Sequence, residues 1–138
     1  VWYYIKSREK KLVARQKELE QKIEIATEDI KGQKHIIEEK HKEITDSINY
    51  AERIQKSFLA TKLHLDNNLS EYFVLFKPKE VVSGDFYWSA TLNNGLFALV
   101  TADSTGHGVP GAIMSLLNIG GIEKAIETYT SPADILNS

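Results

Sequence analysis

The sequence predicts an α+β fold in which a long N-terminal helix precedes a small, glycine-rich globular region. Residues 1–60 hold thirteen Lys/Arg and eleven Asp/Glu but only one Gly. Residues 72–138 hold three Lys, six Asp/Glu and seven of the eight Gly. Such a change in composition indicates two kinds of structure, a charged helix and an apolar region with glycine turns.

A heptad repeat runs through the first region. Apolar residues recur at every seventh position, which we call a: Ile23, Ile30, Ile37, Ile44, Ala51 and Phe58. A second row, called d, begins with apolar residues and then becomes mixed: Ile5, Leu12, Leu19, Ala26, Gln33, Lys40, Ser47 and Ile54. This spacing predicts a coiled coil, and Ile at a favours a parallel homodimer. The alternative is a long helix that packs on its own globular region.

We therefore divide the chain into a coiled-coil helix at 1–60, a connector at 61–71 and a globular part at 72–138. Within the last part, "YFVLF" at 72–76 predicts a strand that ends before Pro78. Near the end of the sequence, Ser131 and Pro132 have the residue types of a helix N-cap and first turn. We expect this chain to be part of a longer protein.

The first residues, "VWYYIKSREKK", place three aromatic side chains before a run of basic ones. This order is typical of the cytoplasmic edge of a transmembrane helix, so a membrane-anchored parent on the cytoplasmic side of the inner membrane is one expectation. The other is an ordinary amphipathic helix start in a cytoplasmic protein. The net charge of −2 gives no indication of a nucleic-acid partner, and the absence of Cys excludes disulfides and thiolate metal sites.

The segment "VVSGDFYWSATLNNGLFALVTAD" predicts a β-hairpin with a three-residue loop at 93–95. In that register the paired residue numbers sum to 188. The pairs on one face are then all apolar: Leu92–Leu96, Ala90–Ala98, Trp88–Val100 and Phe86–Ala102. A two-residue loop shifts the pairing by one and mixes apolar with polar partners, so burial selects the first register.

The same register places Asp85 directly opposite Asp103. Facing like charges are unfavourable unless something compensates them. Two carboxylates beside Gly84 and the flexible segment "STGHGVPG" are suitable oxygen ligands for Mg²⁺ or Mn²⁺. The pairing alone also allows a second interpretation, in which both acids are solvated at exposed strand ends.

The motifs "FKPKEVVSGDFYW" and "TADSTGHGVPGAIMSLL", preceded by "ITDSINYAERIQKSFL", resemble the SpoIIE-type phosphatases. These are bacterial serine/threonine phosphatases of the PPM (protein phosphatase 2C-like) family. The resemblance covers about residues 44–120 and implies an α/β/β/α sandwich with a pair of Mn²⁺ or Mg²⁺ ions. One departure is Ala60, where the family usually has proline.

The resemblance also implies roles for individual residues. Asp85 matches one metal ligand of the family, Asp103 matches the acid that bridges the two ions, and Ser104 matches a ligand that acts through its backbone carbonyl. A metal-activated water would then attack the phosphorus of a phosphoserine or phosphothreonine in a regulatory protein. His107 differs in spacing from the histidine of the eukaryotic relatives, so its role stays open; ordering the loop by a hydrogen bond is the simpler one.

The resemblance further implies that this segment alone is inactive, because the family's remaining metal acids lie downstream of the second motif. Pro110 is expected to start a helix that runs from about 110 to 128, with its N-terminus near the acids, where phosphate is favoured. The alternative function is non-catalytic: a coiled-coil module that dimerises or transmits a signal and carries a degenerate phosphatase remnant.

Overall fold

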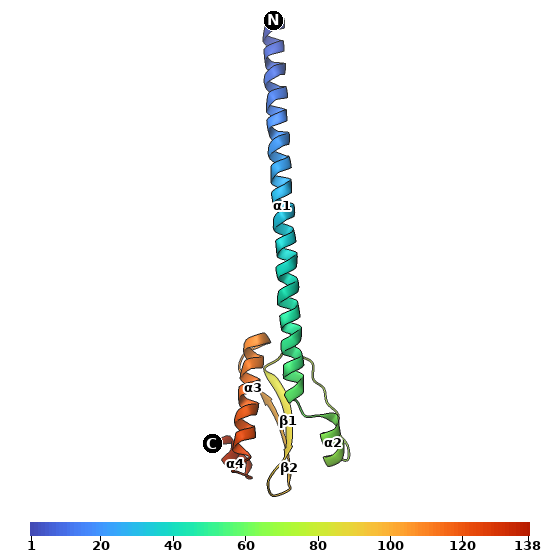
Figure 1. Cartoon of the computed structure of the whole chain (residues 1–138), viewed down its shortest axis with the longest axis vertical. Helices are drawn as coiled ribbons and strands as arrows, with labels where there is room; N and C mark the ends of the chain where they lie inside the picture. Colours follow the sequence, from blue (N-terminus) through green and yellow to red (C-terminus); the bar gives the residue numbers. More distant parts are fainter. The chain divides into compact units, whose positions relative to one another are not determined.

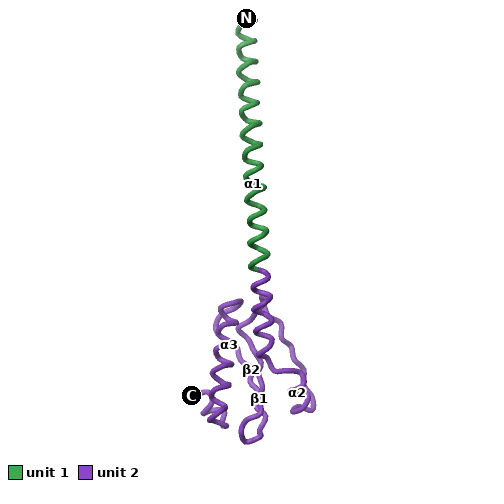
Figure 2. The backbone as a smooth tube through the Cα atoms, viewed as in Figure 1, with its two compact units in different colours: residues 1–44 green, residues 45–138 purple.

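A computed structural model describes all 138 residues and contains four helices and one two-stranded sheet. The elements follow one another as α1, α2, β1, β2, α3 and α4 (Figure 1). The chain divides into two compact units, residues 1–44 and residues 45–138 (Figure 2). No helix combines the length and the apolar character needed to cross a membrane.

Helix α1, Trp2–Phe58, is continuous over 57 residues and contains the whole heptad repeat. In the first unit its apolar a and d side chains are exposed, for example Leu12 at 64%, Ile23 at 64% and Ile37 at 66%. Exposed i,i+3 and i,i+4 ion pairs such as Lys22–Glu18 stabilise the polar faces of such a helix only weakly. The apolar seam therefore has no partner within this unit.

Strands β1, Asp85–Thr91, and β2, Phe97–Asp103, form the predicted antiparallel hairpin. The observed register pairs Asp85 with Asp103 and Trp88 with Val100, as the apolar pattern predicted. Gly95, at φ +81°, completes the loop, and the amide of Leu92 donates to the carbonyl of Leu96 at 2.8 Å. The confirmed register follows from the two-residue period of side-chain burial.

The core of the second unit lies between the apolar face of the hairpin and helix α3, Gly108–Ala125. Phe86 and Trp88 from β1 pack with Ile119 of α3 and with Leu59, which follows α1, and all four are at most 7% exposed. Burial of these four large side chains stabilises the unit, because each buried side chain contributes about 1.5–3 kcal/mol to the free energy of folding.

Gln55 ties the last turns of α1 to this core. Its side chain is 2% exposed; its Nε2 donates to the carbonyl of Ser83 at 2.5 Å and to Ser115 Oγ at 2.9 Å. Its Oε1 accepts from the amide of Ser83 at 3.1 Å. The amide thus pairs with both backbone groups of a residue two positions before Asp85.

We expect Gln55→Ala to lower the free energy of unfolding by about 2–4 kcal/mol, because the buried amide and carbonyl of Ser83 lose their partners. Urea denaturation followed by near-ultraviolet circular dichroism measures this effect. Gln21→Ala, at an outward-facing position of the heptad, is the control and should change stability by less than about 0.5 kcal/mol. Equal effects of the two substitutions would contradict the anchoring role of Gln55.

Two expectations about secondary structure require correction. Residues 72–76 form no strand, because the sheet contains only β1 and β2 and no ladder partner pairs with this segment. Phe73 and Leu75 are 88% and 83% exposed. Helix α3 begins at Gly108 and ends at Ala125, so Pro110 lies in its first turn and residues 126–128 form a turn.

Two short helices flank the hairpin and α3 in the sequence: α2 precedes β1, and α4 follows α3. Helix α2, Lys62–Asn68, begins at an N-cap, Thr61, whose side chain accepts from the amide of His64. Helix α4, Pro132–Leu136, has Ser131 as N-cap and Pro132 in its first turn, as the sequence predicted. The hairpin that carries the candidate acids is thereby held by α3 on one face and contacted by α2 through His64, which bonds to Ser89 at 2.8 Å.

Candidate functional site

The two acids singled out by the sequence meet at the open end of the hairpin. Asp85 is the first residue of β1 and Asp103 the last of β2. The adjacent pair is hydrogen-bonded, because the amide of Ser104 donates to the carbonyl of Gly84 at 3.2 Å. Asp85 and Asp103 therefore form a non-hydrogen-bonded pair, the type in which Cα atoms are about 4.5 Å apart and side chains are closest.

Electrostatically this pair is uncompensated. Neither carboxylate forms an ion pair with a Lys, Arg or His side chain. The pKa of Asp85 is raised above its ordinary value, first by desolvation and then by a hydrogen bond to Asp103 and its like charge. A cation at this place would relieve the like-charge repulsion, which is the smallest of these three contributions to the raised pKa.

The loop after Asp103 approaches the start of β1 very closely. A Cβ atom built at Gly84 would lie 2.5 Å from the Ser104 carbonyl oxygen and 2.6 Å from that of Gly106. A Cβ atom at Gly111 would lie 2.5 Å from the same Gly106 oxygen. Gly106 itself has φ +98°, which side chains disfavour. These glycines thus allow the loop to pack against the strand that carries Asp85.

Ser104 is buried in this packing. The residue is 5% exposed, and its Oγ accepts from Asn118 Nδ2 on α3 at 2.9 Å. Its carbonyl oxygen lies against Gly84, the residue that immediately precedes Asp85. Both acids and the Ser104 carbonyl are consequently grouped around two adjacent strand ends.

His107 fastens the other end of the loop. Its Nδ1 lies 2.5 Å from Oε1 of Glu80, and it is the N-cap residue of α3. The Glu80 carboxylate also lies where a side chain at Gly108 would project. A negative charge near a helix N-terminus is favourable, so the Glu80 carboxylate contributes to the stability of the start of α3. Glu80 was not singled out from the sequence, although it lies in the motif "KPKEVVSGD".

The acids line an open hollow of about 570 Å³ together with the segment 75–77 and residues 86–87 and 101–102. Two uncompensated carboxylates fit a hard divalent cation such as Mg²⁺ or Mn²⁺, which prefers oxygen ligands. The chain contains no cluster of three or more His, Asp or Glu side chains that could hold an ion. The residues present therefore fit part of a metal site.

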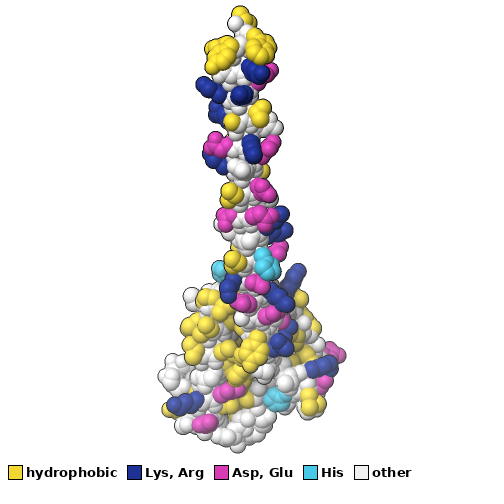
Figure 3. All heavy atoms as spheres, turned by 45° about the horizontal axis from the view of Figure 1, so that its top comes forward, with side chains coloured by type: hydrophobic (Ala, Val, Ile, Leu, Met, Phe, Trp, Pro, Cys, Tyr) yellow, Lys and Arg dark blue, Asp and Glu magenta, His cyan; other side chains and the backbone are white.

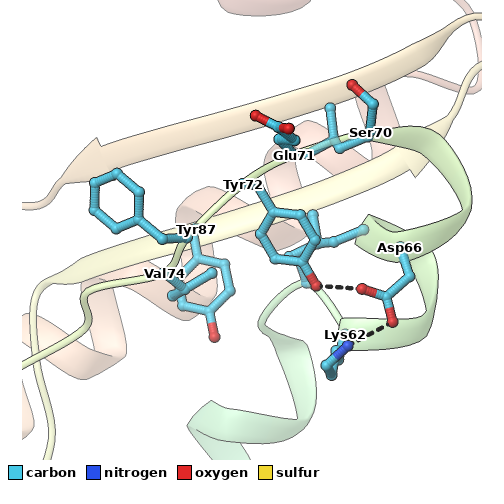
Figure 4. Close-up of a pocket in the computed structure, with 11 residues that line it drawn as sticks. Lys62, Asp66, Ser70, Glu71, Tyr72, Val74 and Tyr87 are labelled. Atoms are coloured by element: carbon cyan, nitrogen blue, oxygen red, sulfur yellow. Dashed lines mark hydrogen bonds and ion pairs between the residues drawn. The ribbon is translucent and has the colours of Figure 1, made fainter.

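A larger hollow, about 630 Å³, lies between α2, the segment 69–74 and Tyr87. Figure 4 shows its polar group, in which Asp66 Oδ2 accepts from Lys62 Nζ and Oδ1 accepts from the Tyr72 hydroxyl, each at 2.7 Å. The Lys62 hydrogen bond, followed by that of Tyr72, lowers the pKa of Asp66. Asp66 is therefore already paired, and the other acid that lines this hollow, Glu71, faces no second carboxylate of the kind that Asp85 and Asp103 form.

We expect Asp85→Asn to stabilise the fold at neutral pH. The raised pKa means that the folded state holds the Asp85 proton more tightly than the unfolded state, so this stabilisation is complete below the ordinary value of 3.8 and is lost as pH rises through the raised pKa. Thermal unfolding should show a higher midpoint for the variant at pH 7 and a much smaller difference below pH 3.8. Asp46→Asn is the control. An equal rise in the unfolding midpoint of this control would contradict a destabilising repulsion between Asp85 and Asp103.

Comparison with known proteins adds one informative match. No family model matches the chain, and no curated protein sequence does. Among solved structures, the chain is similar to the SiaA-PP2C domain of Pseudomonas aeruginosa, with 42% sequence identity and a TM-score of 0.62. The match covers 70% of this chain and 40% of that one, so this chain spans less than half of its neighbour's length. The long helix, the antiparallel hairpin and the packed helices of this chain match an α+β segment of a PP2C-like domain.

Proposed function

We propose that this chain is part of a bacterial signalling phosphatase of the SpoIIE type that removes phosphate from serine or threonine of a regulatory protein. The observation that carries the proposal is the uncompensated pair Asp85–Asp103 in a segment 42% identical to a PP2C domain. The motifs around both acids support the finer assignment. The proposal includes a cytoplasmic location, on the inner side of the membrane where the parent protein is anchored.

In this proposal Asp85, Asp103 and the Ser104 carbonyl hold part of a Mn²⁺ or Mg²⁺ pair. When bound, such ions supply an activated water for attack on phosphorus and neutralise phosphate charge. The protein's own contribution is positional. The hairpin fixes the two acids, the close glycine packing fixes the loop after Asp103, and the Glu80–His107 hydrogen bond fixes the start of α3.

The proposed phosphatase is controlled through its N-terminal helix. The exposed Ile seam of α1 supports a dimeric coiled coil, since such a seam is buried by a second helix. Gln55 then links the end of this helix to Ser83, two residues before Asp85. The second candidate function is a dimerisation or signal-transmission module without catalysis. It is favoured by the presence of only two carboxylates, Asp85 and Asp103, at the candidate site.

The decisive experiment uses the longer protein that contains this chain and the remainder of the domain. Purified protein is incubated with phosphoserine and phosphothreonine proteins, with Mn²⁺, with Mg²⁺ or with EDTA. We expect hydrolysis that requires the divalent ion. A protein that dimerises but releases no phosphate under any of these conditions would favour the non-catalytic module.

The 138-residue chain itself should bind Mn²⁺ weakly and turn over no p-nitrophenyl phosphate. Two carboxylates and one carbonyl supply three ligands where a hard cation takes about six oxygens, so water must fill the rest. Titration calorimetry should give a dissociation constant in the millimolar range, which corresponds to a binding free energy of about −4 kcal/mol. Binding should weaken further as acid protonates Asp85, whose pKa is raised. A micromolar constant would show that further groups complete the site within this chain or its dimer.

A further inference from the structure

The hydroxyl of Ser104 is paired with a side chain of helix α3. Its Oγ atom accepts a hydrogen bond from Asn118 Nδ2 at 2.9 Å, which joins the residue after Asp103 to the third turn of the helix. Because Ser104 is only 5% exposed, water has little access to this hydroxyl. A buried hydroxyl without a hydrogen bond is unfavourable, so the orientation of Ser104 depends on Asn118.

The packing of α3 on the hairpin places Asn118 at this position. Ser115 and Ile119, which lie on either side of Asn118 in the helix, are 0% exposed, and Ile119 belongs to the core cluster of the second unit. Asn118 lies beside this buried face and is itself exposed. Its side chain therefore reaches Ser104 from the edge of the core.

The loop that follows Ser104 has few other attachments. Gly106 and Gly108 have φ +98° and +58°, and glycine leaves the backbone the largest conformational freedom. The hydrogen bond between His107 and Glu80 joins side chains that are 72% and 48% exposed. Figure 3 shows many charged side chains along α1, whereas apolar and uncharged groups cover most of the globular part. The neutral Asn118–Ser104 bond is thus the attachment nearest to the candidate carbonyl ligand.

We propose that Asn118 is a positioning residue, which keeps the Ser104 backbone carbonyl beside the carboxylates of Asp85 and Asp103. Asn118 touches neither a metal ion nor the phosphate; it acts through the hydroxyl of the residue that supplies the carbonyl. Residues that hydrogen-bond to a metal ligand and orient it commonly contribute roughly 10–100-fold to metal affinity. The inference rests on the proposed function, because it requires that the Ser104 carbonyl is a metal ligand.

The test measures Mn²⁺ binding by titration calorimetry, without substrate, in the longer protein that contains this chain and the remainder of the domain. Asn118→Ala should raise the dissociation constant for Mn²⁺ about tenfold. Ser104→Ala removes the same hydrogen bond but keeps the backbone carbonyl, so it should cause an equal loss of affinity. The double variant should bind no more weakly than either single variant, because both substitutions delete one interaction.

Kinetics with the phosphoprotein separate positioning from a general loss of structure. For Asn118→Ala, the Mn²⁺ concentration that gives half-maximal activity should rise with the dissociation constant. The KM for the phosphoprotein at saturating Mn²⁺ should stay unchanged, because the substitution removes no contact to substrate. Circular dichroism confirms that each variant is folded. If Asn118→Ala does not fold, Ser104→Ala decides the question, since it deletes the same hydrogen bond from the other side.

Asn93→Ala is the matched control. Asn93 lies in the hairpin loop, at the opposite end of the strands from the acids, and its Nδ2 donates to the carbonyl of Glu127 just after α3 at 3.0 Å. This variant also loses a bond between hairpin and helix, but its Mn²⁺ affinity should stay unchanged. If the wild type binds Mn²⁺, then unaltered affinity in Asn118→Ala, losses that multiply in the double variant, or an equal loss in Asn93→Ala would overturn this inference alone. A wild-type protein that binds no Mn²⁺ would overturn the proposed function as well.

Discussion

Asp103→Ala is expected to abolish Mn²⁺-dependent hydrolysis of a phosphoprotein by the longer phosphatase that we propose. In the family that the motifs resemble, the matching acid bridges both ions, so its loss removes water activation and charge neutralisation together. Initial rates of phosphate release at saturating Mn²⁺ measure the effect. Asp85→Ala, which removes the opposite carboxylate, should cause a loss nearly as large.

Asp134→Ala is the matched control, because this acid lies in the first turn of α4 and not on the hairpin. It should retain most of the activity. Circular dichroism of each variant separates a catalytic loss from unfolding. If Asp103→Ala keeps more than about a tenth of the activity, the barrier has risen by less than about 1.4 kcal/mol, and the bridging role is wrong.

Ile37→Lys combined with Ile44→Lys is expected to convert a dimer into a monomer. Both side chains are on the a row and are exposed at 66% and 58% in the single chain. In a parallel coiled coil each would be buried against its counterpart, and two lysines at each level would place like charges in an apolar seam. Sedimentation equilibrium of the 138-residue chain and of the variant measures the change in mass.

Ile25→Lys combined with Ile36→Lys is the matched control, because these isoleucines are also exposed but lie outside the a and d rows. This variant should remain dimeric. Dimerisation at tens of micromolar requires a favourable association free energy of roughly 7 kcal/mol. A wild-type chain that is monomeric at this concentration would contradict the coiled coil.

The sequence by itself determined the elements whose signals are local and periodic. The long helix follows from its heptads, and the hairpin register follows from alternation, because a shift of one residue would exchange the apolar face containing Phe86 and Trp88 with the polar one. The opposition of Asp85 and Asp103 is a direct consequence of that register. Ser131 and Pro132 likewise set the start of α4 through backbone geometry alone.

Only the tertiary structure decided the contacts between elements distant in sequence. Gln55 is a polar residue off the heptad seam, where a solvated side chain is the usual outcome, yet it is buried because Ser83 offers both an amide and a carbonyl to it. Glu80 reaches His107 across 27 residues. Conversely, residues 72–76 have strand-forming side chains but form no strand. A strand and a buried amide both depend on hydrogen-bond partners supplied by other segments, and local composition does not specify whether those partners are in reach.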